Sequence, residues 1–172
     1  QILHHEGDAG AYLTAAISFA KDPASETWNC AYNRLMIQGR DRTSIHLTAG
    51  KHLWEFHRIA ESRGEPLSVA FAIGVHPAIA LGALAIGSID EDERAIMGAL
   101  LGEPLELVKC ETSDVLAPAQ ADMVIEGEIL PGERTLAALH EGGMRRMSFV
   151  DFHEFRDVGL FRDDVEYDRG ML

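Results

Sequence analysis

The sequence has few cysteines, no long apolar run and no visible signal peptide. It holds only two cysteines, and a chain of 172 residues buries roughly 70% of its unfolded surface, so no disulfide or metal is needed for folding. Cys30 and Cys110 lie in apolar, strand-like segments, and we expect two buried free thiols. The longest apolar run, 77–86, is far shorter than the ~20 residues of a membrane span, and no signal peptide is visible. We therefore expect a cytoplasmic protein.

Basic residues are also scarce. The chain has 15 Lys and Arg against 28 Asp and Glu, a formal net charge of -13. Binding to nucleic acid relies on Lys and Arg displacing counterions from phosphates, so this balance disfavours a nucleic-acid partner. With 47% hydrophobic and 25% charged residues and no low-complexity tract, the composition is that of a globular domain.

The common phosphate, dinucleotide and zinc motifs are missing as well. The sequence has no G-x-G-x-x-G, no P-loop, no C-x-x-C and no H-E-x-x-H. What remains is a set of scattered polar residues that composition alone cannot join into a site. They are His4, His5, Asn29, Arg34, His46, His52, Glu93, Glu126 and Glu141.

What the sequence does contain is a succession of strands with helices at their connections. Apolar and β-branched runs bounded by turns predict strands over 12–20, 27–38, 43–48, 66–74, 104–112 and 121–130. We expect an α+β, mostly β fold, because a small barrel with inserted helices fits this order better than a doubly wound parallel sheet.

Three helices are predicted between these strands. Residues 51–63 have apolar positions at helical spacing, and Gly64 stands where a C-terminal cap is expected. Pro77 occupies the first position of a second helix. Asp90 and Glu93 form a D-x-x-E capping box that opens a third helix over 92–102.

Four stretches resemble one known family. They are "QILHHEGDAGAYLTAAISFAKDP", "WNCAYNRLMI", "AFAIGVHPAIALGALA" and "MGALLGEPLELVKCETSDVLAPAQADMVIEGEILPGER". Their order and spacing are similar to those of the central domain of the UbiD family of decarboxylases. The most specific piece, "GEPLELVKCETSDVLAPAQADMVIEGEILPGE", is very similar to the corresponding segment of the family. The resemblance covers residues 1–134. Residues 135–172 form a C-terminal extension whose structure the sequence does not predict.

The resemblance implies a split β-barrel related to flavin-binding barrels. It also implies a prenylated FMN (prFMN) cofactor whose phosphate is held through a divalent metal, Mn²⁺ or Mg²⁺, with K⁺ nearby. In the family an asparagine, a histidine and a glutamate bind the metal, and the matching residues here are Asn29, His52 and Glu93. An arginine five residues after the asparagine polarises the substrate carboxylate, and Arg34 matches it. The implied cofactor-binding positions are Asn29, Ala31, Tyr32, Asn33, Arg34, Lys51, His52 and Glu93.

These residue types suit those roles chemically. Amide, carboxylate and phosphate oxygens with one imidazole are a suitable ligand set for Mn²⁺ or Mg²⁺ and a poor one for copper. A planar guanidinium grips a carboxylate through two hydrogen bonds while it stays charged. The cofactor acts as the electron sink, and the protein supplies orientation and electrostatics.

On the residues alone, other interpretations stay open. Glu93 is also the third helical position of the capping box, and Glu91 is a neighbouring candidate ligand. His52 alone is a helix-start histidine, and Arg34 alone is a solvent-facing strand residue. Asn29 alone is a turn residue at a strand start.

The spacing of Asn29 and Arg34 raises a geometric problem. Side chains five residues apart point to opposite faces of a regular strand, so the two cannot face one ligand without a bulge or twist. We therefore predict a local irregularity near Cys30–Asn33.

The match weakens after residue 134. In the family, one glutamate orients the arginine and a second acid returns a proton to the product carbon. Glu141 in "LHEGGMRRM" answers to the first, Arg146 occupies the place of the second, and Glu154 is only a distant substitute. We therefore expect a carboxy-lyase acting on an aromatic or α,β-unsaturated acid, with its activity in isolation left open. The alternative is a non-catalytic flavin-binding or assembly module.

The family's C-terminal α/β domain, which closes over the cofactor, has no counterpart in the sequence, which opens on Gln rather than Met. This suggests a piece of a longer polypeptide. We expect a homo-oligomer, or a complex with a chain that supplies that domain, and a small carboxylic acid as substrate.

Overall fold

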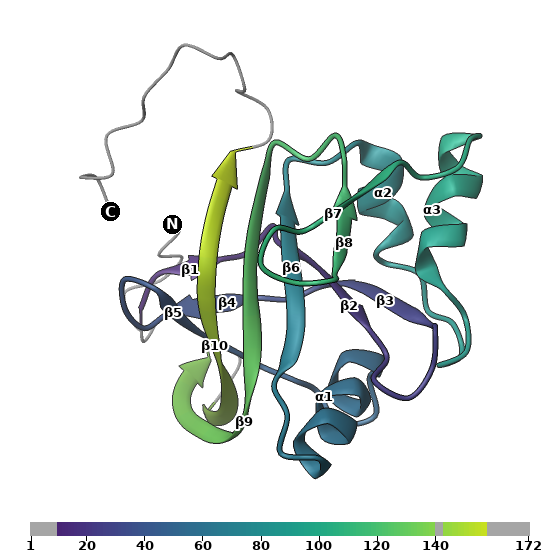
Figure 1. Cartoon of the computed structure of the whole chain (residues 1–172). Helices are drawn as coiled ribbons and strands as arrows, with labels where there is room; N and C mark the ends of the chain where they lie inside the picture. Colours follow the sequence, from purple (N-terminus) through teal and green to yellow (C-terminus); the bar gives the residue numbers. More distant parts are fainter. Residues whose placement is uncertain (1–9, 140–142, 158–172) are drawn as a thin grey trace.

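An eight-stranded antiparallel sheet forms the body of the chain in the computed structural model, which describes residues 10–139 and 143–157 (Figure 1). Its strands follow the order β1-β4-β5-β10-β9-β6-β2-β3. The bounds are β1 Tyr12–Leu13, β2 Ile17–Lys21, β3 Trp28–Tyr32, β4 Leu35–Ile37, β5 Arg42–Ile45, β6 Leu67–Ile73, β9 Met123–Leu139 and β10 Gly143–Asp157. A separate hairpin pairs β7 Leu107–Lys109 with β8 Leu116–Pro118.

The sheet curls because the same chain segments build both of its ends. The pair β1–β4 stands at one end of the strand order and β2–β3 at the other. Only three residues separate β1 from β2, and only two separate β3 from β4. The ends of the sheet are therefore joined by chain continuity, as in a split β-barrel, and the predicted α+β, mostly β class is confirmed.

Two predicted strands are each divided in two. The segment 12–20 forms β1 and β2, and 27–38 forms β3 and β4 with a break at Asn33 and Arg34. Asn33 holds the break, since its Nδ2 donates to Ser18 Oγ at 2.8 Å and its backbone N–H donates to Ala16 O at 3.2 Å. The predicted irregularity is confirmed, and it falls at the end of the predicted range.

Strand β6 is buried on both faces. Val69 and Phe71 pack into one hydrophobic cluster with Phe56 of α1, and Ala70 and Ala72 pack into a second cluster. A strand covered on both sides reads as a continuous apolar run rather than an alternating one, which explains the "LSVAFAI" pattern.

Three helices cover the sheet, as predicted. α1 (His52–Ser62) lies near the lower end of the sheet in Figure 1, and α2 (Pro77–Gly82) and α3 (Glu93–Leu101) pack against each other beside β8. α1 ends as expected, since Gly64 takes a left-handed conformation with φ +70. No helix in the described part of the chain is long and apolar enough to cross a bilayer.

The predicted capping box of α3 is wrong. Asp92, not Asp90, is the N-cap, and its Oδ1 accepts a hydrogen bond from the backbone N–H of Arg94 at 3.0 Å. Glu93 is then the first helical residue rather than the third. Its carboxylate reaches a neighbouring strand instead of the helix's own backbone.

The region after 134, whose structure the sequence leaves open, contributes to the main sheet. β9 continues to Leu139, and β10 pairs with both β9 and β5.

Within β9, Glu126 is 2% exposed and accepts hydrogen bonds from the N–H of Glu111 and from the N–H and hydroxyl of Thr112. It therefore anchors the loop between β7 and β8.

Helix α1 is attached to β9 by buried and half-buried polar groups. His57, 2% exposed, has its Nε2 3.1 Å from Leu130 O. Glu61 Oε1 accepts from Gly132 N at 2.7 Å and from Arg134 Nη2 at 2.6 Å. These bonds fix the helix whose opposite end begins at His52.

The burial of His57 predicts a pH-dependent stability. Burial lowers the pKa of His57 below its ordinary value of 6.5. As pH falls below 6.5 the unfolded chain takes up a proton at this site before the folded chain does, so the free energy of unfolding decreases. Urea denaturation between pH 7.5 and 5 should show a smaller decrease in the free energy of unfolding for His57→Gln than for the wild-type chain, because Gln does not titrate. Equal slopes for the two proteins would contradict the assignment.

Candidate functional site

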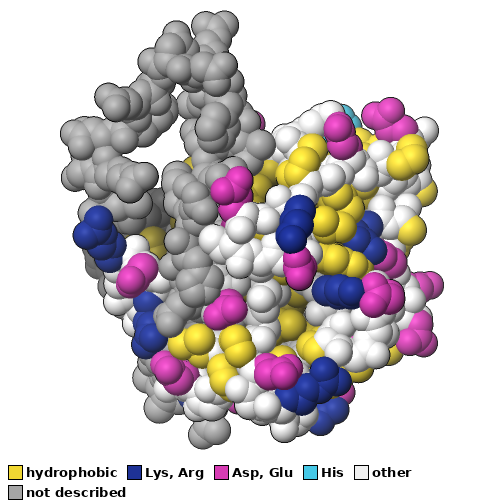
Figure 2. Space-filling model, in the orientation of Figure 1, with side chains coloured by type: hydrophobic (Ala, Val, Ile, Leu, Met, Phe, Trp, Pro, Cys, Tyr) yellow, Lys and Arg dark blue, Asp and Glu magenta, His cyan; other side chains and the backbone are white. Residues whose placement is uncertain are grey.

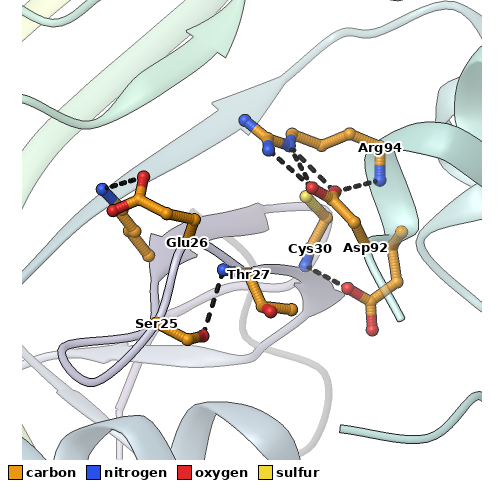
Figure 3. Close-up of polar contacts among 8 residues, drawn as sticks. Ser25, Glu26, Thr27, Cys30, Asp92 and Arg94 are labelled. Atoms are coloured by element: carbon orange, nitrogen blue, oxygen red, sulfur yellow. Dashed lines mark hydrogen bonds and ion pairs between the residues drawn. The ribbon is translucent and has the colours of Figure 1, made fainter. Parts of the chain in front are cut away.

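The carboxylate of Glu93 is the centre of a buried polar cluster. Glu93 is 3% exposed, and its Oε1 accepts a hydrogen bond from Asn29 Nδ2 at 3.2 Å. Its Oε2 accepts from the backbone N–H of Cys30 at 3.3 Å, and a dashed line at Cys30 marks this hydrogen bond in Figure 3. Because β3 is the last strand of the sheet order, Glu93 satisfies an amide on an otherwise open edge.

Asn29 is left with an oxygen that has no partner. The side chain is 4% exposed, and its Oδ1 has no hydrogen-bond partner among the described residues. A buried carbonyl-type oxygen without a partner is costly, so such an atom calls for an explanation. Oxygen is also the donor type that Mg²⁺ and Mn²⁺ prefer.

His52 approaches the same carboxylate from α1. Its Nδ1 lies 3.1 Å from Glu93 Oε1, and its side chain is 17% exposed. The cluster thus unites Asn29 of β3, His52 of α1 and Glu93 of α3. Among the described residues, no group of three or more His, Cys, Asp and Glu side chains is placed to hold a metal. His52 and Glu93 are only two such side chains, so a metal held here by three side chains would also need the Asn29 oxygen.

Two adjoining pockets open beside this cluster. The larger, of about 440 Å³, is lined by Asn29, His52 and Glu93 together with the loop 83–87. The smaller, of about 310 Å³, is lined by Arg34, Tyr12 and Thr14. Both pockets share the lining residues Tyr32, Asn33, His46 and Thr48.

Every predicted cofactor-binding residue lines one of the two pockets. Seven of them line the larger one, namely Asn29, Ala31, Tyr32, Asn33, Lys51, His52 and Glu93. Arg34 lines the smaller one. The break after β3 explains how residues on one strand segment reach neighbouring pockets, because Arg34 lies beyond the regular strand that carries Asn29.

Other predicted acids lie elsewhere. Glu91 is exposed, and its Oε2 accepts from Ser88 N at 2.9 Å, so the structure brings Glu93 rather than Glu91 to Asn29 and His52. Glu126 anchors the β7–β8 loop. Glu141, the second predicted catalytic residue, lies outside the described residues, as do His4 and His5.

Sequence reasoning missed several residues of the pocket lining, among them the loop 83–87 and His46. The loop 83–87 carries only Ala, Leu, Ile and Gly, so no residue in it signals chemistry. His46 was visible as a candidate, but nothing in its local pattern indicates that it lies between the two pockets.

The sequence family described as "3-octaprenyl-4-hydroxybenzoate carboxy-lyase Rift-related domain" matches residues 1–157. The chain belongs to the UbiD family. The family resemblance of the sequence is thereby confirmed.

Individual UbiD relatives match at moderate to high identity. The anhydromevalonate phosphate decarboxylase of Methanothermobacter thermautotrophicus is 36% identical over 157 residues, which is 91% of this chain and 34% of that protein. An evolved dimeric form of the UbiD-class enzyme HmfF from Pelotomaculum thermopropionicum, solved in complex with prFMN, is 47% identical with a TM-score of 0.83. That match covers 87% of this chain and 36% of the enzyme. The chain thus spans about a third of the length of these relatives.

The likeness of fold extends beyond the family. Flavoredoxin of Desulfovibrio vulgaris (Miyazaki F) has a TM-score of 0.58 at 15% identity, over 91% of this chain and 75% of the flavoredoxin. At this identity the likeness concerns the fold alone, and it agrees with the predicted relation to flavin-binding barrels.

Both cysteines are free and buried, as predicted. Burial, together with the nearby Glu93 and Asp92 carboxylates, raises the pKa of the Cys30 thiol well above its ordinary value. Since the thiolate is the reactive form, Cys30 should be inert in the folded chain.

Alkylation tests this environment. Iodoacetamide at pH 8 should modify Cys30 roughly 100-fold more slowly in the native chain than in urea, because reaction requires local opening. Peptide mass spectrometry of both cysteines measures the rates separately. Equal rates for Cys30 in the two conditions would contradict its burial against Glu93.

Proposed function

We propose that this chain is the cofactor-binding domain of a UbiD-type (de)carboxylase or of its subunit. The reaction is the non-oxidative decarboxylation of an aromatic or α,β-unsaturated carboxylic acid, with prFMN and a divalent metal. One observation carries the proposal: Glu93 joins Asn29 and His52 at the wall of a pocket, with Asn29 Oδ1 left without a partner, while Arg34 lines the adjoining pocket.

The three residues fit a hard divalent ion. Asn29 would offer its free Oδ1, Glu93 a carboxylate oxygen and His52 a ring nitrogen, which is the donor set expected for Mn²⁺ or Mg²⁺. Their hydrogen bonds to one another already place all three at one wall. Such a preformed set would need little rearrangement to hold the metal and, through it, the cofactor phosphate.

The remaining lining residues orient ligands. Lys51 precedes α1 and lines the larger pocket, where its positive charge would favour a phosphate. K⁺ is a further ion that we propose for this site. Arg34 would hold the substrate carboxylate through a bidentate pair. The bound prFMN supplies the electron sink for decarboxylation. The assignment of Glu141 as the residue that orients Arg34 remains part of the proposal.

A partner would complete the site. Ile86 lines the larger pocket yet is 90% exposed, and Leu84 beside it is 61% exposed. Figure 2 shows hydrophobic side chains gathered where α2, α3 and the β7–β8 hairpin lie. We propose that a further domain, from the same or another chain, covers the pocket and excludes water from it.

Cofactor loading tests the function. The chain should be co-expressed with a flavin prenyltransferase, purified without oxygen, and measured for its absorption spectrum and bound metal. We expect flavin and manganese in about equal amounts, because one metal would carry one phosphate. Absence of both would contradict the proposal. Bound cofactor without carbon dioxide release or hydrogen exchange on candidate acids would favour a non-catalytic flavin-binding module.

Three variants separate the roles of the site residues. Asn29→Ala and Glu93→Ala should lower metal and flavin retention by roughly 10-fold or more, because each removes a ligand. Arg34→Ala should retain both and lower turnover of the assembled enzyme by roughly 100-fold, because it removes only the carboxylate contact. Glu91→Ala serves as the matched acidic control. Equal behaviour of all the variants would contradict separate roles.

A further inference from the structure

We propose that Arg94 is the residue that positions Glu93: its guanidinium grips Asp92 and stacks on Trp28, and so fixes the first turn of α3 against β3. The importance of this for metal binding rests on the proposed function. The positioning itself rests only on contacts within the chain.

The first contact is within the helix start. Arg94 Nε lies 2.9 Å from Asp92 Oδ1 and 3.1 Å from Oδ2, and Nη2 lies 2.5 Å from Oδ2. Figure 3 shows the guanidinium turned back onto this carboxylate. Asp92 is also the N-cap of α3. A single carboxylate therefore both caps the helix and holds the arginine in one orientation.

The second contact joins the helix to the strand. The guanidinium carbon of Arg94 lies 4.4 Å from the centroid of the Trp28 ring, a cation–π distance. Trp28 is 5% exposed and is the residue immediately before Asn29 in β3. Arg94 therefore contacts Trp28, and Glu93 contacts Asn29, the next residue of the strand. Because successive side chains point to opposite faces of a strand, the two contacts lie on opposite faces of β3.

These contacts solve a problem that α3 would otherwise have. Met97 fixes the middle of α3 against α2, since it is fully buried and lies so close to Gly82 that a Cβ there would be 2.5 Å from its side chain. Nothing in that contact fixes the direction in which the first turn points. The Trp28–Arg94 pair provides this second point and so helps to hold the first turn with Glu93 toward Asn29.

The charges at the start of α3 also favour this role for Arg94. Asp92 and Glu93 are adjacent carboxylates, and Glu93 is almost fully buried. An unpaired Asp92 would repel the buried carboxylate and favour its movement toward water. Arg94 pairs with Asp92 and so offsets this repulsion without occupying the oxygens of Glu93 that face Asn29 and His52.

The test uses the Cys30 amide as a local reporter, because it donates to Glu93. Arg94→Gln should speed hydrogen exchange of this amide by roughly 10-fold relative to the amides that pair β3 with β2, measured by NMR. The same variant should weaken FMN binding in the presence of MnCl₂ by roughly 10-fold, measured by calorimetry. Arg58→Gln is the matched control, because it removes an exposed ion pair with Glu55 on α1, and neither of these residues lines either pocket.

Substitutions at Trp28 provide the rescue. Trp28→Phe keeps an aromatic face for the guanidinium and should stay close to wild type in both measurements, whereas Trp28→Leu should resemble Arg94→Gln. Arg94→Gln with Cys30 exchange and FMN affinity equal to those of the Arg58→Gln control would overturn the proposal. If the wild-type chain bound neither FMN nor Mn²⁺, the proposed function would fail, and the exchange measurement would still decide the positioning role.

Discussion

The geometry of the site depends on one buried carboxylate. Glu93 accepts hydrogen bonds from a side chain and a backbone amide of β3 and lies within hydrogen-bonding distance of a histidine of α1, so three elements distant in sequence meet at its two oxygens. A buried carboxylate is tolerated only when its oxygens have hydrogen-bond partners. The burial of Glu93 therefore depends on these partners together. The polar cluster thereby joins α1 and α3 to the open edge of the sheet.

A second constraint is the interruption between β3 and β4. A regular strand would direct Asn29 and Arg34 to opposite faces, whereas the break at Asn33 and Arg34 lets the chain turn from one pocket to the next. The Asn33 side chain holds this turn through Ser18 on the neighbouring strand. Asn33 thus explains how Asn29 and Arg34 can line adjoining pockets.

Local patterns predicted the elements well and the site only in part. The apolar run of β6 and the glycine after α1 follow directly from burial and backbone conformation. The D-x-x-E pattern misled, because Asp92 caps α3 equally well from two residues further on and so frees Glu93 to reach β3. Only the family resemblance singled out Glu93. The loop 83–87 carries no functional side chain, and its place at the pocket depends on tertiary packing that local patterns do not encode.

The distribution of charge gives the pockets a character opposite to that of the whole chain. The formal net charge is -13, yet Glu93 is the only acidic residue that lines either pocket in the described part of the chain. Arg34 and Lys51 line the same two pockets, together with two histidines. Because Arg34 and Lys51 outnumber the single carboxylate among the lining residues, the field in the pockets favours anions, whereas the net charge of the whole chain repels them. A phosphate at one end and a carboxylate at the other are the kinds of ligand that such an arrangement would select.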